Sequence, residues 1–415
     1  MHRRRVAAAA AALVSLAVSV LATAPSISPA TVTAAGSSPS ISGSVSGSTT
    51  ASEDPAGSVR VVAGDEAALA ARAAALVATM TPREKAGAVV MGHLPSTDPA
   101  AVRAYMEQTG AGGFIVMGAN GEGTESAMRE RATAAAVDPA LPALVAVDQE
   151  GGDVRRLKWD DFPSSLTLKT AAPQATASAF SGRGSLVERA AIDVNFGIVA
   201  DYTADPGSFI YRRSLGTDAA DAAPRVAAAV AGEAPFVDST LKHFPGHGAA
   251  PGDSHRTIPS TSMSLDQWRA GEALPFRAGI DAGAELVMFG HLAYTSVDAA
   301  PASLSVTWHD ILRNELGFTG VAITDDMAML EASGIAAFRD PVDNAVAALV
   351  AGNDMVLGVS YSSVGRANAV IDGIAAAVES GTLSSERLDE AATRVVMLRL
   401  SSATDGALPC TNCGM

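Results

Sequence analysis

The segment from Leu241 to His255, LKHFPGHGAAPGDSH, holds one Lys, three His and one Asp within fifteen residues. An imidazole has a pKa of about 6.5, so histidines here can both donate and accept a proton near neutral pH. The apolar residues before Lys242 predict a strand, and Pro245 and Gly246 predict that the chain then leaves it as a polar loop. Titratable side chains on a loop after a strand indicate a catalytic site that transfers protons.

Two other interpretations of this segment compete with proton transfer. The loop could be solvated, with incidental histidines. It could also bind a metal, because four of its side chains are of metal-ligand types: His243, His247, Asp253 and His255. Helix-breaking Pro and Gly residues prevent the His-x3-His and Asp-x-His steps from lying on one helix face. We therefore expect no metal and no other cofactor.

The composition favours a soluble enzyme. The chain has 415 residues, of which 48% are hydrophobic and 18% charged, enough for one large domain or two medium ones. The formal net charge of −15 argues against nucleic acid as a partner and fits a neutral or weakly charged substrate.

Residues 1–24 have the pattern of an export signal. Three arginines precede an apolar run from Val6 to Leu21, and Ala22-Thr23-Ala24 is a suitable cleavage site. The run is borderline in length for spanning a bilayer, so an uncleaved membrane anchor is the alternative. Its many alanines make the run weakly hydrophobic, which favours cleavage, a secreted protein and no stable membrane insertion.

Two further segments lie outside the predicted folded region. Residues 25–64 are mostly Ser, Thr, Gly and Ala, which bury too little apolar surface to fold, so we expect a flexible spacer. The tail, residues 403–415, holds both cysteines of the chain, Cys410 and Cys413. One CxxC pair cannot provide four zinc ligands, so we expect a small disulfide or two unpaired thiols there.

Between residues 65 and 402, short apolar runs alternate with Ala-rich segments of helical pattern. Thr81, Pro82 and Glu84 have the spacing of a helix start with a capping box. The segment from Pro341 to Ala351 has an apolar stripe at helical spacing, and Gly352 ends it. Eight strands are predicted: Ala88–Met91, Gly113–Met117, Ala143–Val147, Val194–Val199, Phe236–Leu241, Leu286–Phe289, Gly320–Ile323 and Met355–Val359.

A strand–helix alternation repeated eight times predicts a single catalytic domain with the α/β fold of a (β/α)8 barrel, the TIM type. An open, doubly wound sheet is the alternative, but no glycine-rich dinucleotide fingerprint is present in the sequence.

In such a barrel the catalytic residues lie at the carboxyl ends of the strands. Five predicted strands lead into polar groups suited to chemistry. These are Asp148-Gln149-Glu150 after the third strand, Asp201 and Arg212-Arg213 after the fourth, Lys242-His243 after the fifth, His291 after the sixth, and Asp325-Asp326 after the seventh. Their convergence on one rim predicts an active site there.

The motif KHFPGHG followed by DSH resembles the signature of family 3 glycoside hydrolases, and in particular their single-domain β-N-acetylhexosaminidase branch. The resemblance extends from about Thr81 to Arg399. It implies that the first aspartate of GVAITDDM, Asp325, is the nucleophile that forms a covalent glycosyl-enzyme. From the residues alone, Asp325 could instead cap the next helix, although Asp326 can fill that role.

The same resemblance assigns the general acid/base to a histidine paired with an aspartate after the fifth strand. Asp253-Ser254-His255 matches that motif, so His255 would transfer the proton and Asp253 would orient its ring and stabilise its charged form.

The resemblance also implies a set of sugar-binding residues, whose carboxylates and cations suit hydroxyl groups. These are Asp148, Arg156, Arg213, Lys242 and His243. Three further residues are expected to support them: His247, His291 and Asp326. Asp153 stands where the family usually has Arg, and Tyr211 and Leu215 also depart from the pattern, which we expect to affect the outer sugar subsites.

These features predict a secreted, monomeric, retaining exo-β-N-acetylglucosaminidase that removes terminal β-linked GlcNAc from peptidoglycan fragments or chitin oligosaccharides. A β-glucosidase is one alternative, although that branch usually has Trp where Asp326 stands here. A phosphorylase is another, because a His acid/base does not repel phosphate as a carboxylate does. A non-catalytic cell-wall-binding protein is the third, but such a protein would lack the nucleophile or the acid that this sequence contains.

Overall fold

The structure is a computed structural model, and it describes residues 63–405. The predicted export signal and almost all of the predicted spacer lie outside the described residues, as do Cys410 and Cys413. Within residues 63–405, the helices are all too short or too polar to cross a membrane.

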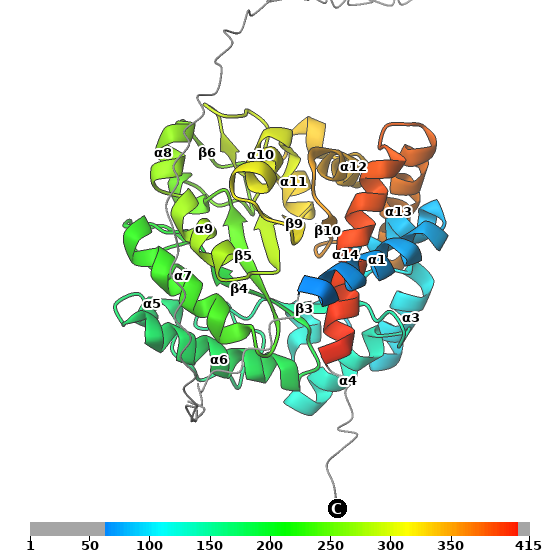
Figure 1. The fold of residues 1–415 in the computed structure, drawn as a ribbon, viewed down its shortest axis with the longest axis horizontal. Coiled ribbons are helices and arrows are strands. Elements are labelled where there is room, and N and C mark those ends of the chain that lie inside the picture. The colour runs from blue at the N-terminus through cyan, green and yellow to red at the C-terminus, as the bar shows by residue number, and fades with distance from the viewer. Residues whose placement is uncertain (1–62, 406–415) are drawn as a thin grey trace, which may run out of the picture. The chain divides into compact units, whose positions relative to one another are not determined.

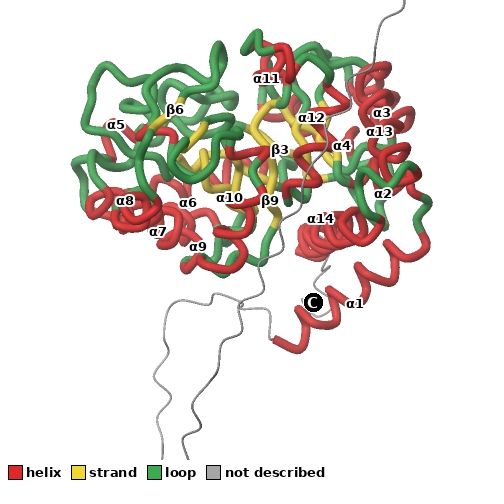
Figure 2. The backbone as a smooth tube through the Cα atoms, turned by 90° about the horizontal axis from the view of Figure 1, so that it is seen from above, coloured by secondary structure: helices red, strands yellow, loops and turns green. Residues whose placement is uncertain are grey.

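Eight parallel strands close into a barrel in the order β1-β10-β9-β7-β5-β4-β3-β2. Helices surround these strands (Figure 1 and Figure 2). The barrel strands are β1 (Val90–Gly92), β2 (Gly113–Val116), β3 (Leu144–Val147), β4 (Val194–Val199), β5 (Asp238–Phe244), β7 (Leu286–Phe289), β9 (Val321–Asp326) and β10 (Met355–Leu357). The prediction of a (β/α)8 barrel is confirmed, and the closed order excludes an open doubly wound sheet.

At least one helix follows each barrel strand. These helices are α3 (Pro99–Thr109), α4 (Glu125–Ala135), α5 (Ser165–Leu168), α6 (Pro173–Arg189), α7 (Ala219–Glu233), α8 (Leu265–Ala270), α9 (Ala273–Asp281), α10 (Val306–Asp310), α11 (Ala328–Ala332), α12 (Pro341–Ala351), α13 (Val364–Glu379) and α14 (Ser385–Asp405). Before β1 come α1 (Ala63–Thr79) and α2 (Pro82–Ala88), and α1 lies beside α14 (Figure 2). A small parallel pair, β6 (Ser260–Thr261) and β8 (Ala293–Tyr294), lies outside the barrel sheet.

Helix ends follow the predicted capping chemistry. Thr81 Oγ1 accepts a hydrogen bond from the Glu84 amide at 3.3 Å, and Glu84 Oε2 accepts one from the Thr81 amide at 2.7 Å. This reciprocal pair satisfies two amides that the first turn of α2 leaves free. Gly352 ends α12 with a φ of 125°, a conformation that a side chain would strain.

Two strands extend further than the sequence predicts. β5 continues beyond Leu241 to Phe244, and β9 continues beyond Ile323 to Asp326. Both extensions begin with polar residues, Lys242 and Thr324, so the apolar pattern of the strands is interrupted before the strands end. β1, in contrast, starts later than predicted, because Ala88 belongs to the last turn of α2. Sheet pairing therefore positions the polar ends of β5 and β9.

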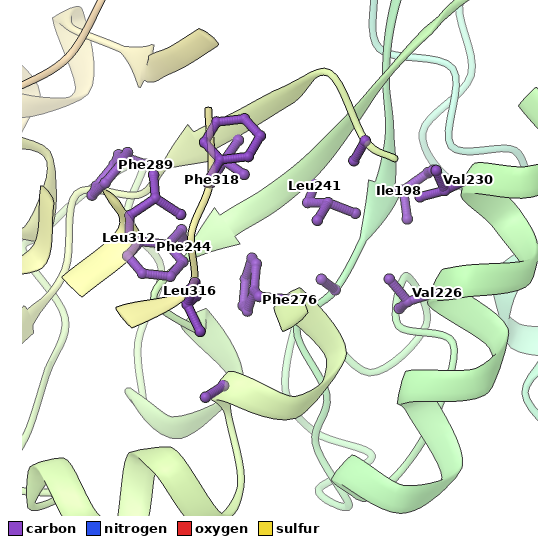
Figure 3. Packing of buried hydrophobic residues seen from close by; sticks show 14 of the residues in the cluster. Ile198, Val226, Val230, Leu241, Phe244, Phe276, Phe289, Leu312, Leu316 and Phe318 are labelled. Atoms are coloured by element: carbon purple, nitrogen blue, oxygen red, sulfur yellow. The ribbon is translucent and has the colours of Figure 1, made fainter. Parts of the chain in front are cut away.

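Residues of β5 contact both sides of the barrel wall. Leu241 and Phe244 pack in a buried cluster with residues of α7, α9 and α10, and Figure 3 shows Phe244 beside Phe276. The centroids of these two rings are 5.2 Å apart. Between Leu241 and Phe244 the pairing register with β7 shifts, so two successive residues, Lys242 and His243, both face the opposite side. Such irregularities redirect side chains next to active sites.

Candidate active site

A cavity of about 380 Å³ lies at the carboxyl ends of the barrel strands. Its volume falls in the range that is usual for small-ligand sites. Eight residues to which the sequence analysis assigned a role line it: Asp148, Arg156, Arg213, Lys242, His243, His255, Asp325 and Asp326. These residues come from four barrel strands, β3, β4, β5 and β9, or from the segments that follow them, as is usual for chemistry at a barrel rim.

Asp325 stands near the end of β9 and lines the cavity. Its Oδ1 accepts a hydrogen bond from the Asp326 amide at 2.8 Å. Burial alone would raise the pKa of Asp325, but His243, His291 and Lys242 outweigh burial, and the pKa is lowered. The side chain is therefore a carboxylate at neutral pH, which is the form that can attack an electrophilic carbon.

Asp326 performs the local structural role that competed for Asp325. Its Oδ1 accepts hydrogen bonds from the amides of Ala328 at 3.2 Å and Val359 at 2.9 Å. Its Oδ2 accepts from the Ser360 amide at 3.1 Å and from the Ser360 hydroxyl at 2.7 Å. Asp326 thus binds the first amide of α11 and ties β9 to the segment after β10, and both Asp325 and Asp326 line the cavity.

A chain of ion pairs lines another part of the cavity. Lys242 Nζ lies 2.8 Å from Asp148 Oδ1 and 2.7 Å from Glu150 Oε1. Arg213 binds Glu150 through two hydrogen bonds of 2.9 and 2.7 Å. Arg156 Nη2 lies 3.6 Å from Asp148 Oδ2. Because both donors and acceptors converge here, the cavity suits a ligand with several hydroxyl groups.

This network keeps its buried members charged. Burial raises the pKa of Glu150, but Arg213 and Lys242 more than compensate, so the pKa lies well below its usual range. Burial lowers the pKa of Lys242, yet Asp148 and Glu150 raise it overall. The sequence places Glu150 at this rim, within the DQEGG segment that carries Asp148, but it assigned Glu150 no role.

Asp201, two residues beyond β4, orients His243. Its Oδ2 lies 2.6 Å from Nδ1 of His243 and accepts the His243 amide at 3.1 Å, while Oδ1 accepts the His247 amide at 2.6 Å. Burial raises the pKa of Asp201, but His243 and His247 lower it overall, so Asp201 is ionised. An ionised carboxylate only accepts hydrogen bonds, so Nδ1 of His243 carries the proton. Nε2 of His243 then faces Arg213 Nη2 at 3.4 Å.

His255 lies on the loop between β5 and β6 and lines the cavity. Asp253 Oδ1 lies 2.7 Å from Nδ1 of His255 and accepts the His255 amide at 3.0 Å. Burial raises the pKa of Asp253, but the bonds from His255 and the charge of Arg256 lower it overall. The His255 side chain is 64% exposed, so its Nε2 can exchange protons with a ligand and with water.

Phe209, on the segment after β4, connects two of the histidines. Its ring meets His247 edge-on with centroids 4.8 Å apart, and it meets His255 at 6.4 Å. The Arg213 guanidinium carbon lies 5.7 Å from the same ring. Phe209 also lines the cavity. The sequence did not predict it as a site residue, because an isolated aromatic residue in a polar segment forms no motif.

His247 and His291 are buried and do not line the cavity. Neither ring nitrogen of His247 has a partner within residues 63–405, and burial lowers its pKa to about 4. His291 lies 2.7 Å from the Ser303 hydroxyl through Nδ1 and 3.0 Å from the Asp326 carbonyl through Nε2. His291 therefore holds the end of β9, next to Asp325.

In the described part of the chain, no three His, Cys, Asp or Glu side chains are grouped to hold a metal ion. His243 and His255 instead each pair with one carboxylate.

The model of the glycosyl hydrolase family 3 N-terminal domain matches residues 81–398. This chain belongs to glycosyl hydrolase family 3. The resemblance stated from the sequence motifs is thereby confirmed. An uncharacterized secreted glycosyl hydrolase of Arthroderma benhamiae is 32% identical over 329 residues, which are 76% of this chain and 92% of that protein. A β-hexosaminidase of Stenotrophomonas maltophilia is 36% identical over 204 residues, which are 45% of this chain and 59% of that protein.

Two solved structures are similar to this family 3 chain. A family 3 β-N-acetylglucosaminidase from Paenibacillus sp. superposes with a TM-score of 0.73 at 29% identity, over 81% of this chain and 65% of that one. LpqI of M. tuberculosis superposes with a TM-score of 0.71 at 27% identity, over 79% of this chain and 96% of that one. The chain thus spans just under two thirds of the Paenibacillus protein and most of LpqI.

Glu272 lies behind the site of this family 3 hydrolase, between α8 and α9. It is buried, it shares a hydrogen bond with Tyr202, and its Oε2 has no partner among the described residues. Burial and the charge of Asp201 raise the pKa of Glu272 to about 8. At neutral pH this carboxyl is therefore mostly protonated.

We predict that thermal stability falls as the pH rises from 6.5 to 8, and that Glu272→Gln weakens this fall. Between its unfolded value near 4.5 and its folded value of about 8, Glu272 keeps a proton in the folded protein that the unfolded chain has lost. Its contribution is therefore present at low pH and lost towards pH 8, with a slope of up to about 1.4 kcal/mol per pH unit. His247 and His309, with pKa values lowered to about 4, act in the opposite direction only below about pH 6.5.

Melting curves at half-unit steps of pH would measure this effect. The exposed Glu379→Gln provides the control, and its stability should follow the pH as the wild type does. Equal slopes for Glu272→Gln and the wild type would contradict the protonated state of Glu272.

Proposed function

We propose that this family 3 hydrolase is a retaining exo-β-N-acetylglucosaminidase. The observation that carries the proposal is that an ionised Asp325 and the imidazole of His255, backed by Asp253, line one cavity. A carboxylate nucleophile and a separate proton donor are the two groups that a double displacement needs. The β-hexosaminidase and β-N-acetylglucosaminidase relatives support the choice of sugar.

In the first step of the proposed reaction, Asp325 attacks the anomeric carbon, and the bond from that carbon to the leaving oxygen breaks. His255 gives its Nε2 proton to the leaving oxygen, while Asp253 accepts the hydrogen bond from Nδ1 and stabilises the ring in its charged form. The product of this step is an ester between the sugar and Asp325, and the leaving group departs as an alcohol.

In the second step, His255 takes a proton from a water molecule, which attacks the same carbon and displaces the Asp325 carboxylate. His255 is thereby protonated again, and the enzyme returns to its starting state. Because the carbon is inverted twice, the released sugar keeps the β configuration.

The ion-pair network would hold the sugar in place for this attack. Lys242 and Arg156 can donate hydrogen bonds to sugar hydroxyls, and Asp148 can accept hydrogen bonds from them. Arg213 and His243 lie along the same wall. Three methionines, Met117, Met288 and Met329, line the cavity beside these polar groups and offer apolar contact to an acetamido methyl.

We further propose that the enzyme is secreted, acts as a monomer and uses peptidoglycan fragments or chitin oligosaccharides. The support for secretion is the export-signal pattern of residues 1–24 and the relative described as secreted.

The test of the proposed function compares two chromogenic substrates that differ only at C2. We expect kcat/KM for an aryl β-GlcNAc to exceed that for the aryl β-glucoside by at least about a hundredfold, because a site that satisfies the acetamido group leaves polar partners unpaired without it. The aryl α-GlcNAc serves as a control and should not react. Equal cleavage of the glucoside and the GlcNAc compound would contradict the proposed sugar.

A further inference from the structure

Tyr361, four residues after β10, lines the same cavity as Asp325. Its exposed fraction, 72%, is the highest among the large hydrophobic residues that the structure describes. Its φ is 58°, in the left-handed region that bulky residues rarely adopt. Both the exposed ring and the backbone conformation are unfavourable by themselves, and such features are concentrated at functional sites.

The residues on either side of Tyr361 are fixed to the barrel. Ser360 donates hydrogen bonds from its amide and its hydroxyl to Asp326 Oδ2, at 3.1 and 2.7 Å. Ser362 donates from its hydroxyl to the His93 carbonyl at 2.6 Å. These bonds hold the turn that carries Tyr361 at the edge of the cavity.

One contact supports the ring itself. The guanidinium carbon of Arg366 lies 5.9 Å from the centroid of the Tyr361 ring, and Arg366 is in turn paired with Glu331. The rest of the ring faces solvent at the mouth of the cavity. A rigid aromatic surface supported on one side offers apolar contact to a flat ligand on the other.

We infer that Tyr361 is the surface on which the sugar ring of the leaving group stacks. This inference rests on the function proposed above. The sugar that reacts would occupy the polar part of the cavity, where Lys242 is buried and paired with Asp148. Tyr361 is too exposed to belong to that part, and an exo-acting enzyme directs its leaving group towards the mouth. The C–H face of a pyranose matches an aromatic ring, whereas a small alkyl leaving group cannot cover it.

The test uses two substrates with the same reacting sugar, the disaccharide GlcNAc-β-1,4-GlcNAc and methyl β-GlcNAc. The variant Tyr361→Asn removes the ring, and Asn is chosen because it tolerates a left-handed φ. We expect the ratio of kcat/KM for the disaccharide to kcat/KM for the methyl glycoside to fall about 2- to 10-fold in this variant. Tyr361→Phe keeps the ring and should keep the ratio.

The control is Val350→Asn, which changes another exposed apolar residue that does not line the cavity and should leave the ratio as in the wild type. An unchanged ratio in Tyr361→Asn would overturn the inference, whether both kcat/KM values stay as in the wild type or both fall equally. An equal fall would mean a structural effect through Ser360 and Asp326. If the wild type hydrolyses both compounds, either result leaves the proposed function standing. If the wild type hydrolyses neither compound, the proposed function fails, and the inference fails with it.

Discussion

Replacement of Asp325 by alanine is expected to lower kcat/KM for an aryl β-GlcNAc by about 10⁴-fold or more, which is the scale for loss of a covalent nucleophile. Asp325 lies near the end of β9, and His243, His291 and Lys242 lower its pKa, so no proton has to leave before it attacks. Steady-state kinetics of the purified variant would measure the loss.

Two controls separate this chemical effect from misfolding. Asp372→Asn changes an exposed carboxylate on α13 and should keep wild-type activity. Sodium azide should restore part of the activity of Asp325→Ala and give the α-glycosyl azide, because azide enters from the face that the carboxylate has vacated. Activity within about tenfold of the wild type would contradict the assignment of the nucleophile.

Replacement of His255 by alanine is expected to have an effect that depends on the leaving group. A sugar alkoxide needs a proton in order to leave, so kcat/KM for the disaccharide should fall about 10²- to 10⁴-fold. A dinitrophenolate leaves without a proton, so kcat/KM for the dinitrophenyl glycoside should fall less than about tenfold. The value of kcat/KM reports only the steps up to formation of the glycosyl-enzyme. The comparison therefore does not include the effect of losing the base, which acts in the second step.

Asp253→Asn extends this test to the partner of His255. It should show the same dependence on the leaving group with a smaller loss, since Nδ1 would lose its charged acceptor. Equal losses of His255→Ala on both substrates would mean that His255 is structural. Loss of wild-type activity with a chelator and its return with zinc would favour a metal site instead.

The barrel was predictable from the sequence because each strand contributes a short apolar run to the core. The prediction stopped early on β5 and β9, where Lys242 and Asp325 belong to strands although their side chains are polar. At these positions sheet pairing and the function of the site outweigh the apolar pattern.

The choice between Asp325 and Asp326 depended on the family resemblance, since both follow the same apolar run. The structure separates them by local bonds, because Asp326 accepts the amides of Ala328 and Val359. Other features depend on contacts between distant segments. Asp201 and His243 are 42 residues apart in the chain, and no local pattern connects them. The left-handed backbone of Tyr361 likewise follows from its fixed neighbours and not from its own residue type.

Covalent trapping tests the proposed nucleophile most directly. A 5-fluoro derivative of a β-GlcNAc glycosyl fluoride reacts readily in the first step and hydrolyses slowly, so the glycosyl-enzyme accumulates. After digestion, we expect mass spectrometry to find the added sugar on the peptide GVAITDDM, with fragmentation placing it on Asp325. A label on Asp326, on another carboxylate or on no residue during complete turnover would contradict the account.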